Sequence, residues 1–257
     1  MAGGWTVASA CSKGSSHSKI GTPCQDSAQV SFIETLEGEL LIATVSDGAG
    51  SAGHSEVGSK LAVENLAALV EEYFSDGSRL EDLDREIAAH WMLHIQDALC
   101  ADAARAGRQV RDYACTLIGA IVGPQSAAFF QIGDGAIVAA HDTDEWDYVF
   151  WPQHGEFANS TNFVSSRDVL TILDFQFSHR RVDELCLFTD GLENLLLHQA
   201  SRTVHKPFFQ SIFKPLRQSE RCGVDDELSQ ALNRYLSSDQ ICEKTDDDKT
   251  LVLAKRL

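Results

Sequence analysis

Residues 40–53, LLIATVSDGAGSAG, form the stretch from which the fold can be argued. The stretch opens with an apolar, partly β-branched run at 40–45, which is typical of a buried strand. The run breaks at Ser46-Asp47-Gly48, so a carboxylate directly follows a rigid strand and has a glycine beside it. Because glycine has no Cβ, a ligand can approach the backbone closely there. Asp47 and the Gly48 carbonyl can therefore serve a hard cation such as Mg²⁺ or Mn²⁺.

The same kind of strand ending recurs along the chain. Three further expected strands adjoin aspartates, namely 127–132 before Gly133-Asp134-Gly135, 185–188 before Thr189-Asp190-Gly191, and 250–254 after Asp246-Asp247-Asp248. One Asp-Gly pair alone indicates only a hairpin turn. Four such strand ends in a shared sheet predict a metal site that holds more than one ion.

Composition narrows the class of protein. The chain has 257 residues, 44% of them hydrophobic, and a net charge of −17. Such a charge argues against nucleic-acid binding, and most of it is expected on the solvated surface. No linker rich in Pro, Gly or Ser divides the sequence and no repeat is present, so we expect a single domain spanning residues 1–257.

The cysteines and the N-terminus indicate a compartment. The seven cysteines include no C-x-x-C pair, which favours neither a disulfide framework nor a zinc site and fits a reducing cytoplasm. The first residues lack the basic and apolar regions of a signal peptide, and no stretch is long and apolar enough to span a membrane. We therefore expect a cytoplasmic protein that does not bind membranes.

The order of the expected elements indicates the fold class. Strands at 5–12, 28–35 and 40–45 precede helices at 55–74 and from Ser78 to about Ala106, where Ser78 and Glu81 form a capping box. Strands then follow up to 184–188, including one at 169–177, and short helices precede a last strand. Residues 13–23 are expected to form a polar loop and residues 152–168 a flap. This order predicts an α+β fold, an antiparallel β-sandwich flanked by helices in four α-β-β-α layers.

These residues resemble a known family. The ordered pieces are Cys24-Gln25-Asp26-Ser27, Ser46-Asp47-Gly48-Ala49-Gly50, Cys115-Thr116-Leu117, Ile132-Gly133-Asp134-Gly135, Thr189-Asp190-Gly191-Leu192 and Asp247-Asp248-Lys249-Thr250. Each piece is short, but the ordered set spans residues 24–250 and resembles the metal-dependent, type 2C protein serine/threonine phosphatases. The flap segment 156–163 looks closest to a bacterial branch. The family's fold is a β-sandwich flanked by helices.

The resemblance implies roles for individual residues. Asp47 would bridge two metal ions, and the Gly48 carbonyl would ligate one of them. Asp190 and Asp247 would hold the other ion, and Asp134 would help to hold a third. Asp26 would hydrogen-bond metal-bound water. The cofactor would be two or three Mg²⁺ or Mn²⁺ ions.

Three departures from the family pattern bear on substrate binding. The family's phosphate-clamping arginine, five residues before Asp26, is replaced by Gly21, and Lys19 or His17 could take that role. A lysine lacks the bidentate fork of arginine. The histidine that acts as a general acid in many eukaryotic members is replaced by Ala49, and the nearby His54 is a candidate donor. Ala136 replaces an arginine that is usual after the family's Gly-Asp-Ser.

Three functions remain open at this stage. By the resemblance, the chain would be a phosphatase that hydrolyses phosphoserine or phosphothreonine in proteins with a hydroxide that bridges two metals, and we expect a monomer. The missing arginine favours, as an alternative, an inactive relative that binds phosphoproteins as a regulatory module. A phosphatase of small phosphorylated metabolites is the third possibility, which a deep pocket under the 152–168 flap would favour.

Overall fold

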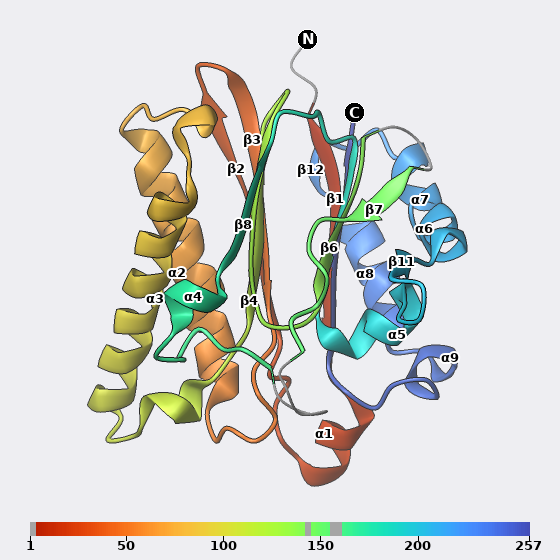
Figure 1. Cartoon of the computed structure of the whole chain (residues 1–257). Coiled ribbons are helices and arrows are strands. Elements are labelled where there is room, and N and C mark those ends of the chain that lie inside the picture. The colour runs from red at the N-terminus through yellow and green to blue at the C-terminus, as the bar shows by residue number, and fades with distance from the viewer. Residues whose placement is uncertain (1–3, 142–144, 155–160) are drawn as a thin grey trace.

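Two β-sheets lie face to face between two layers of helices (Figure 1). The structure is a computed structural model that describes residues 4–141, 145–154 and 161–257. One sheet has the order β2 (Ser27–Thr35), β3 (Gly38–Ser46), β4 (Leu117–Val122), β5 (Ala127–Ile132), β8 (Asp174–Ser178). The other has the order β12 (Gly223–Val224), β1 (Trp5–Ser12), β13 (Lys249–Arg256), β9 (Glu184–Phe188), β6 (Ala136–Ala140), β7 (Trp146–Tyr148). Among the described strands the pairing within both sheets is antiparallel, except for the short parallel contact of β1 with β12.

The helices form the outer layers. The five-stranded sheet is covered by the long helices α2 (Ser55–Ser75) and α3 (Arg85–Arg105), with α4 (Val169–Ile172) nearby (Figure 1). The six-stranded sheet is covered by α5 (Glu193–Leu196), α6 (Lys206–Ile212), α7 (Lys214–Gln218), α8 (Asp226–Leu236) and α9 (Asp239–Cys242), beside the small hairpin β10 (Leu197–His198) and β11 (Thr203–Val204). The predicted four-layer α+β sandwich is confirmed. Within the described ranges, no helix is long and apolar enough to cross a membrane.

Strand β3 explains how a sandwich of this kind forms from the sequence. Leu40 and Ile42 pack in the apolar cluster under α2 and α3, whereas Leu41, Ala43 and Val45 pack in the cluster between the two sheets. Both faces of the strand are therefore buried, which is why its sequence is a continuous apolar run instead of an alternating one. Burial of this strand on both sides fixes the position of the residues that follow it.

The register of the strands brings the ends of several strands to one edge of the sandwich. Ser27 pairs with Ser46, and Leu117 pairs with Ile132. In the other sheet, Phe188 pairs with both Ala136 and Leu251. The turns and loops that carry the aspartates after β3, β5 and β9 and before β13 therefore leave the sheets at the same edge. The short helix α1 (Ser15–Ile20) lies at this end of the molecule, away from the two termini (Figure 1).

Several local predictions are corrected by the structure. The expected polar loop at 13–23 contains α1, which ends at Gly21 with a left-handed φ of 77°. The second long helix starts at Arg85, with the Asp84 side chain accepting from the Ile87 N–H, and residues 80–82 before it form a 3₁₀ turn (η1, Leu80–Asp82). The buried side chains of Leu80 and Leu83 hold that turn against the core, which overrides the capping pattern at Ser78. Likewise, the expected strand at 169–177 begins as helix α4. Six residues of the expected flap 152–168, namely 155–160, lie outside the described residues.

We expect Phe130 to be a main contributor to stability on the α2/α3 side. Its side chain is fully buried on β5, and its ring meets Trp91 of α3 edge to face with centroids 6.4 Å apart. Phe130→Ala should lower the free energy of unfolding by about 3–5 kcal/mol, because a large cavity opens under α3. Phe130→Leu, the matched control, should lower it by about 1 kcal/mol. Urea denaturation of the two variants measures both values, and equal losses would contradict this packing account.

Candidate metal centre

A polar cavity of about 800 Å³ opens at the sandwich edge where the aspartate-bearing strands end. Four of the predicted metal-binding aspartates line it: Asp47, Asp134, Asp190 and Asp247. Carboxylate oxygens of Asp47, Asp134 and Asp190 lie within 4.8 Å of one another. Asp247 lies in the exposed wall of the same cavity, outside that tight group. The fold therefore converges carboxylates from four separate segments on one space, as the recurring strand endings predicted.

Asp47 is held rigidly at the end of β3. Its backbone N–H donates to Thr116 Oγ1 over 2.9 Å, and the Thr116 N–H donates back to the Asp47 carbonyl over 2.8 Å. The next residue, Gly48, has its N–H bonded to the Gln25 carbonyl, and a Cβ at Gly48 would lie only 2.7 Å from that oxygen and from the Ser55 carbonyl. A side chain does not fit at Gly48, so the glycine is required by close backbone packing.

Asp134 lies in the turn between β5 and β6. The flanking Gly133 and Gly135 have φ values of 98° and 83°, a region that favours glycine. The Asp134 N–H donates to Thr161 Oγ1, and the Gly135 N–H donates to Glu193 Oε1 over 2.6 Å. The Asp-Gly signal here marks a genuine turn and also places a carboxylate in the cavity.

Asp190 and Asp26 are linked through Thr189. Asp190 begins the 3₁₀ turn η3 (Asp190–Leu192) that follows β9. Thr189 Oγ1 donates to Asp26 Oδ2 over 2.7 Å and accepts from the Thr250 N–H. Asp26 is itself buried behind Asp47. The structure thus brings the predicted supporting residue into the same network as the predicted ligands.

The three consecutive aspartates before β13 have different environments. The side chain of Asp246 is exposed, and that of Asp247 lines the cavity. Asp248 points inward: its carboxylate accepts from the backbone N–H groups of Gly14 and Gln25, each over 2.6 Å, and Nδ1 of His17 lies 2.8 Å from it. Asp248 therefore fastens the start of α1 and the segment before β2 to β13.

The electrostatics of the cavity favour a bound cation. Burial, together with Asp134 and Asp247, raises the pKa of Asp190 to about 8, and burial raises the pKa of Asp26 to about 6. Burial and the neighbouring carboxylates of Asp26 and Asp190 raise the pKa of Asp47 well above its usual range. In each case desolvation and like charge disfavour the ionised form. A divalent cation would supply the missing opposite charge.

The unpaired carboxylate oxygens in and behind the cavity also favour a bound cation. Asp26 Oδ1 and Asp134 Oδ1 are buried without a hydrogen-bond partner. Among the described residues, no lysine, arginine or histidine forms an ion pair with Asp47, Asp134 or Asp190. Oxygen ligands of this kind, not ion-paired to a described cationic side chain, fit Mg²⁺ or Mn²⁺. The expected divalent-metal cofactor agrees with this donor set.

The residues expected to bind the substrate phosphate or to donate a proton lie in different parts of the structure. His17 lines the cavity from α1. Lys19, on the same helix, is exposed and does not line it. His54 precedes α2 with Nδ1 3.7 Å from Glu56 Oε1, and it also lies outside the cavity lining. Of the three candidates, the structure brings only His17 to the aspartates.

Two cavity residues escaped the sequence analysis. His154, in the first part of the flap, and Glu193, at the start of α5, both line the cavity and form an ion pair across 3.2 Å. His154 and Glu193 belong to no sequence motif that we recognised. They are 39 residues apart in the chain, and the fold brings them together. The position of Glu193, three residues after Asp190, was the available signal, because a short helical turn places it beside the strand end.

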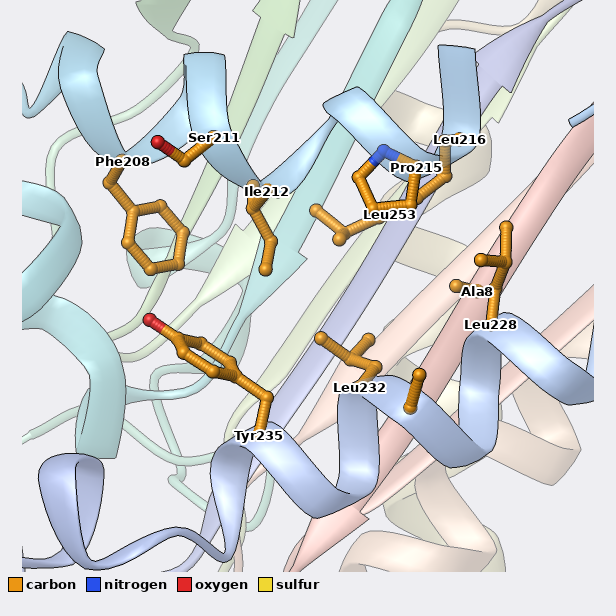
Figure 2. A pocket seen from close by; sticks show the side chains of 11 residues that line it. Ala8, Phe208, Ser211, Ile212, Pro215, Leu216, Leu228, Leu232, Tyr235 and Leu253 are labelled. Carbon is orange, nitrogen blue, oxygen red and sulfur yellow. The ribbon is translucent and has the colours of Figure 1, made fainter. Parts of the chain in front are cut away.

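A second cavity, of about 320 Å³, lies under α6, α7 and α8 and is apolar (Figure 2). Phe208 and Ile212 of α6 and Leu232 and Tyr235 of α8 point into it, and Leu253 of β13 also lines it. Its lining offers no carboxylate, histidine or thiol. Of these two cavities, only the carboxylate cavity at the sheet edge offers carboxylates and imidazoles that can bind a metal ion or transfer a proton.

Comparison with known proteins agrees with this geometry. Residues 13–237 match the family model described as protein phosphatase 2C. The chain is 34% identical over 253 residues to Serine/threonine-protein phosphatase 3 of Escherichia coli (strain K12), covering 97% of this chain and 98% of that protein.

Solved structures show the same fold at low sequence identity. The catalytic domain of the serine/threonine protein phosphatase PstP, in complex with two manganese ions, aligns with a TM-score of 0.64 and 16% identity over 99% of both chains. A serine/threonine phosphatase from Staphylococcus aureus aligns with a TM-score of 0.60 and 16% identity, covering 97% of this chain and 94% of that one. At these identities the structural likeness supports the fold alone.

The raised carboxylate pKa values predict how pH affects the metal-free protein. Between the unfolded value near 4 and the folded values of about 6 and 8, the folded chain retains protons that the unfolded chain has released. Stability should therefore fall as pH rises through this window, so the melting temperature should be higher at pH 6 than at pH 8. Mn²⁺ should raise it more at pH 8, where fewer protons compete. Asp190→Asn should flatten the pH dependence, and an equal Mn²⁺ effect at both pH values would contradict the account.

Asp248 is predicted to be structural, in contrast with its neighbour Asp246. Asp248→Ala should lower the free energy of unfolding by roughly 3 kcal/mol, because buried N–H groups of Gly14 and Gln25 lose their acceptor. Asp246→Ala, an exposed neighbour, should change it by less than about 0.5 kcal/mol. Urea denaturation compares the two variants, and similar values for both would show that the inward hydrogen bonds are unimportant.

Proposed function

The chain belongs to the protein phosphatase 2C family, and we propose that it hydrolyses phosphoserine and phosphothreonine in proteins with the help of two or three Mg²⁺ or Mn²⁺ ions. The observation that supports this most is the convergence of Asp47, Asp134 and Asp190 within 4.8 Å, with Asp247 in the same cavity. The name of the E. coli relative and the manganese ions in the PstP structure agree with this substrate class and cofactor.

The proposed ligands are Asp47, Asp134, Asp190, Asp247 and the carbonyl of Gly48. When bound, the ions would neutralise charge on the phosphoryl oxygens and activate a water molecule for in-line attack. Asp26 would orient Asp47 from behind and hydrogen-bond an ordered water, for which its unpaired Oδ1 is available. Burial of these carboxylates lowers the local dielectric, which strengthens the attraction between the site and the charged phosphate–metal complex.

His17 is the proposed anchor for the substrate phosphate. Asp248 holds its Nδ1 over 2.8 Å, so its other ring nitrogen is oriented while the side chain is only 13% exposed. A single imidazole supplies fewer donors than the fork of an arginine. We therefore infer weaker phosphate binding than an arginine at position 21 would give. Lys19 is exposed and lies outside the cavity lining, so it does not take the same role.

The cysteines and the net charge bear on the protein's location and partners. We infer a single phosphatase domain across residues 1–257 that acts as a monomer in the cytoplasm, where its seven free cysteines would stay reduced. The net charge of −17 disfavours nucleic acid and anionic membrane surfaces as partners. The partner is a phosphorylated protein, whose side chain can reach the metal cavity at the edge of the sandwich.

Turnover measurements test the proposed function. With Mn²⁺ or Mg²⁺ the chain should hydrolyse p-nitrophenyl phosphate and a phosphothreonine peptide, and EDTA should abolish both activities. Asp190→Ala should lower kcat/KM by more than about 100-fold, because a direct ligand matters at least as much as the residues behind it. Asp97→Ala, on the exposed face of α3, is the matched control and should have no effect.

Other outcomes would favour the remaining alternatives. A folded chain that binds Mn²⁺ and the phosphopeptide but turns over neither substrate would contradict the phosphatase proposal and support the phosphoprotein-binding module. Faster hydrolysis of free phosphothreonine than of the peptide would instead support a metabolite phosphatase.

A further inference from the structure

The proposed hydrolysis needs a proton at the leaving group. When the bond between phosphorus and a threonine Oγ breaks, the electron pair stays on Oγ, and the resulting alkoxide is very unstable near neutral pH. A proton donor close to that oxygen therefore accelerates the step. A p-nitrophenolate leaving group is a stable anion and depends much less on such a donor. This inference rests on the proposed function and concerns which residue supplies the proton.

Among the described residues that line the carboxylate cavity, two carry an imidazole: His17 and His154. The expected donor His54 does not line it. The other titratable groups of the lining are carboxylates: four are the proposed metal ligands, and the fifth, Glu193, is the ion-pair partner of His154. The choice is therefore between the two histidines.

Depth in the cavity separates these histidines. The His17 side chain is 13% exposed and is bonded to Asp248, a buried residue that also ties down two backbone N–H groups. The His154 side chain is 49% exposed. The phosphoryl group must lie deep, among the carboxylates and their cations, whereas the leaving oxygen remains attached to a protein chain outside the cavity. The more exposed His154 is therefore better suited than His17 to reach the leaving oxygen.

Glu193 orients the His154 ring. Its carboxylate is 6% exposed, and Oε2 lies 3.2 Å from His154 Nε2. Its other oxygen, Oε1, accepts the Gly135 N–H over 2.6 Å, which fixes the carboxylate next to the turn that carries Asp134. Nε2 is engaged by a buried carboxylate, and within the described part of the chain no hydrogen bond to Nδ1 is found, so Nδ1 is the ring nitrogen available to a substrate.

The backbone at His154 is fixed to the same turn. His154 forms an isolated β-bridge with Thr161, and Thr161 Oγ1 accepts the Asp134 N–H over 3.1 Å. The preceding Gln153 accepts the Gly133 N–H through Oε1 over 2.8 Å and bonds back to the Gly133 carbonyl. The imidazole is therefore held from two sides relative to Asp134, as expected for a group that acts on a substrate at this site.

We propose that His154 is the proton donor to the leaving oxygen and that Glu193 is its positioning residue. In the step, the oxygen of water forms a bond to phosphorus while the bond from phosphorus to the serine or threonine Oγ breaks. The proton on His154 Nδ1 moves to that Oγ, which leaves as a hydroxyl group. The attacking water releases one proton to solvent as the phosphate product forms, and the neutral imidazole takes one proton from solvent, so that atoms and charge balance over the cycle.

Leaving-group dependence tests this role. His154→Gln should lower kcat for a phosphothreonine peptide by about 100-fold or more, the size expected for loss of a general acid, and should lower kcat for p-nitrophenyl phosphate by less than about 5-fold. Glu193→Gln keeps an acceptor for Gly135 and should show the same bias to a smaller extent. His90→Gln, exposed on α3, is the matched control and should affect neither substrate. Melting temperatures with Mn²⁺ verify that each variant is folded.

The outcomes separate this role from the proposed function. Equal losses on both substrates, or no loss on either, would overturn the proton-donor role while leaving the phosphatase proposal intact. Partial rescue of the His154→Gln variant by added imidazole, on the peptide substrate only, would support the role. Absence of metal-dependent turnover in the unaltered chain would overturn the proposed function and the role of His154 with it.

Discussion

Electrostatic repulsion among buried carboxylates is the constraint on which the account of this molecule depends. Three aspartates from the ends of β3, β5 and β9 bring carboxylate oxygens within 4.8 Å of one another, with Asp26 buried behind them. Without a cation, burial and the neighbouring carboxylates favour the protonated form, so the pKa of Asp190 rises to about 8, and burial raises the pKa of Asp26 to about 6. The sandwich maintains the cluster because each strand is fixed by packing, and each aspartate lies one or two residues after the end of its strand.

Periodic apolar strands and the residues that end them could be predicted from the sequence. The run 40–45 is buried on both faces, so its apolar pattern and its end at Asp47 were both visible. Repetition of that ending at Asp134 and Asp190 was enough to predict the cluster. Local patterns failed where tertiary packing decides the outcome: the capping pattern at Ser78 yields to the burial of Leu80 and Leu83, and a polar Gly-bounded segment contains α1.

The supporting pairs could not be predicted, because they join distant segments. Asp248 reaches His17 and Glu193 reaches His154, and no spacing in the sequence relates the members of either pair. Both pairs have the same organisation, in which a buried carboxylate binds a backbone N–H with one oxygen and orients an imidazole with the other. They flank the metal cavity at different depths. A chain with glycine at position 21 and alanine at position 49 thus still has two imidazoles, each paired with a carboxylate, in the lining of the cavity.

Direct measurement of Mn²⁺ stoichiometry tests the central claim, that this edge of the sandwich is a centre for more than one divalent ion. Calorimetric titration of Mn²⁺ into the metal-free chain should show at least two ions bound per chain, with protons released into the buffer as carboxylates ionise. The isosteric variant Asp47→Asn should lose the tighter ions while remaining folded. A folded chain that binds one ion or none, or a variant that binds as the unaltered chain does, would contradict the claim.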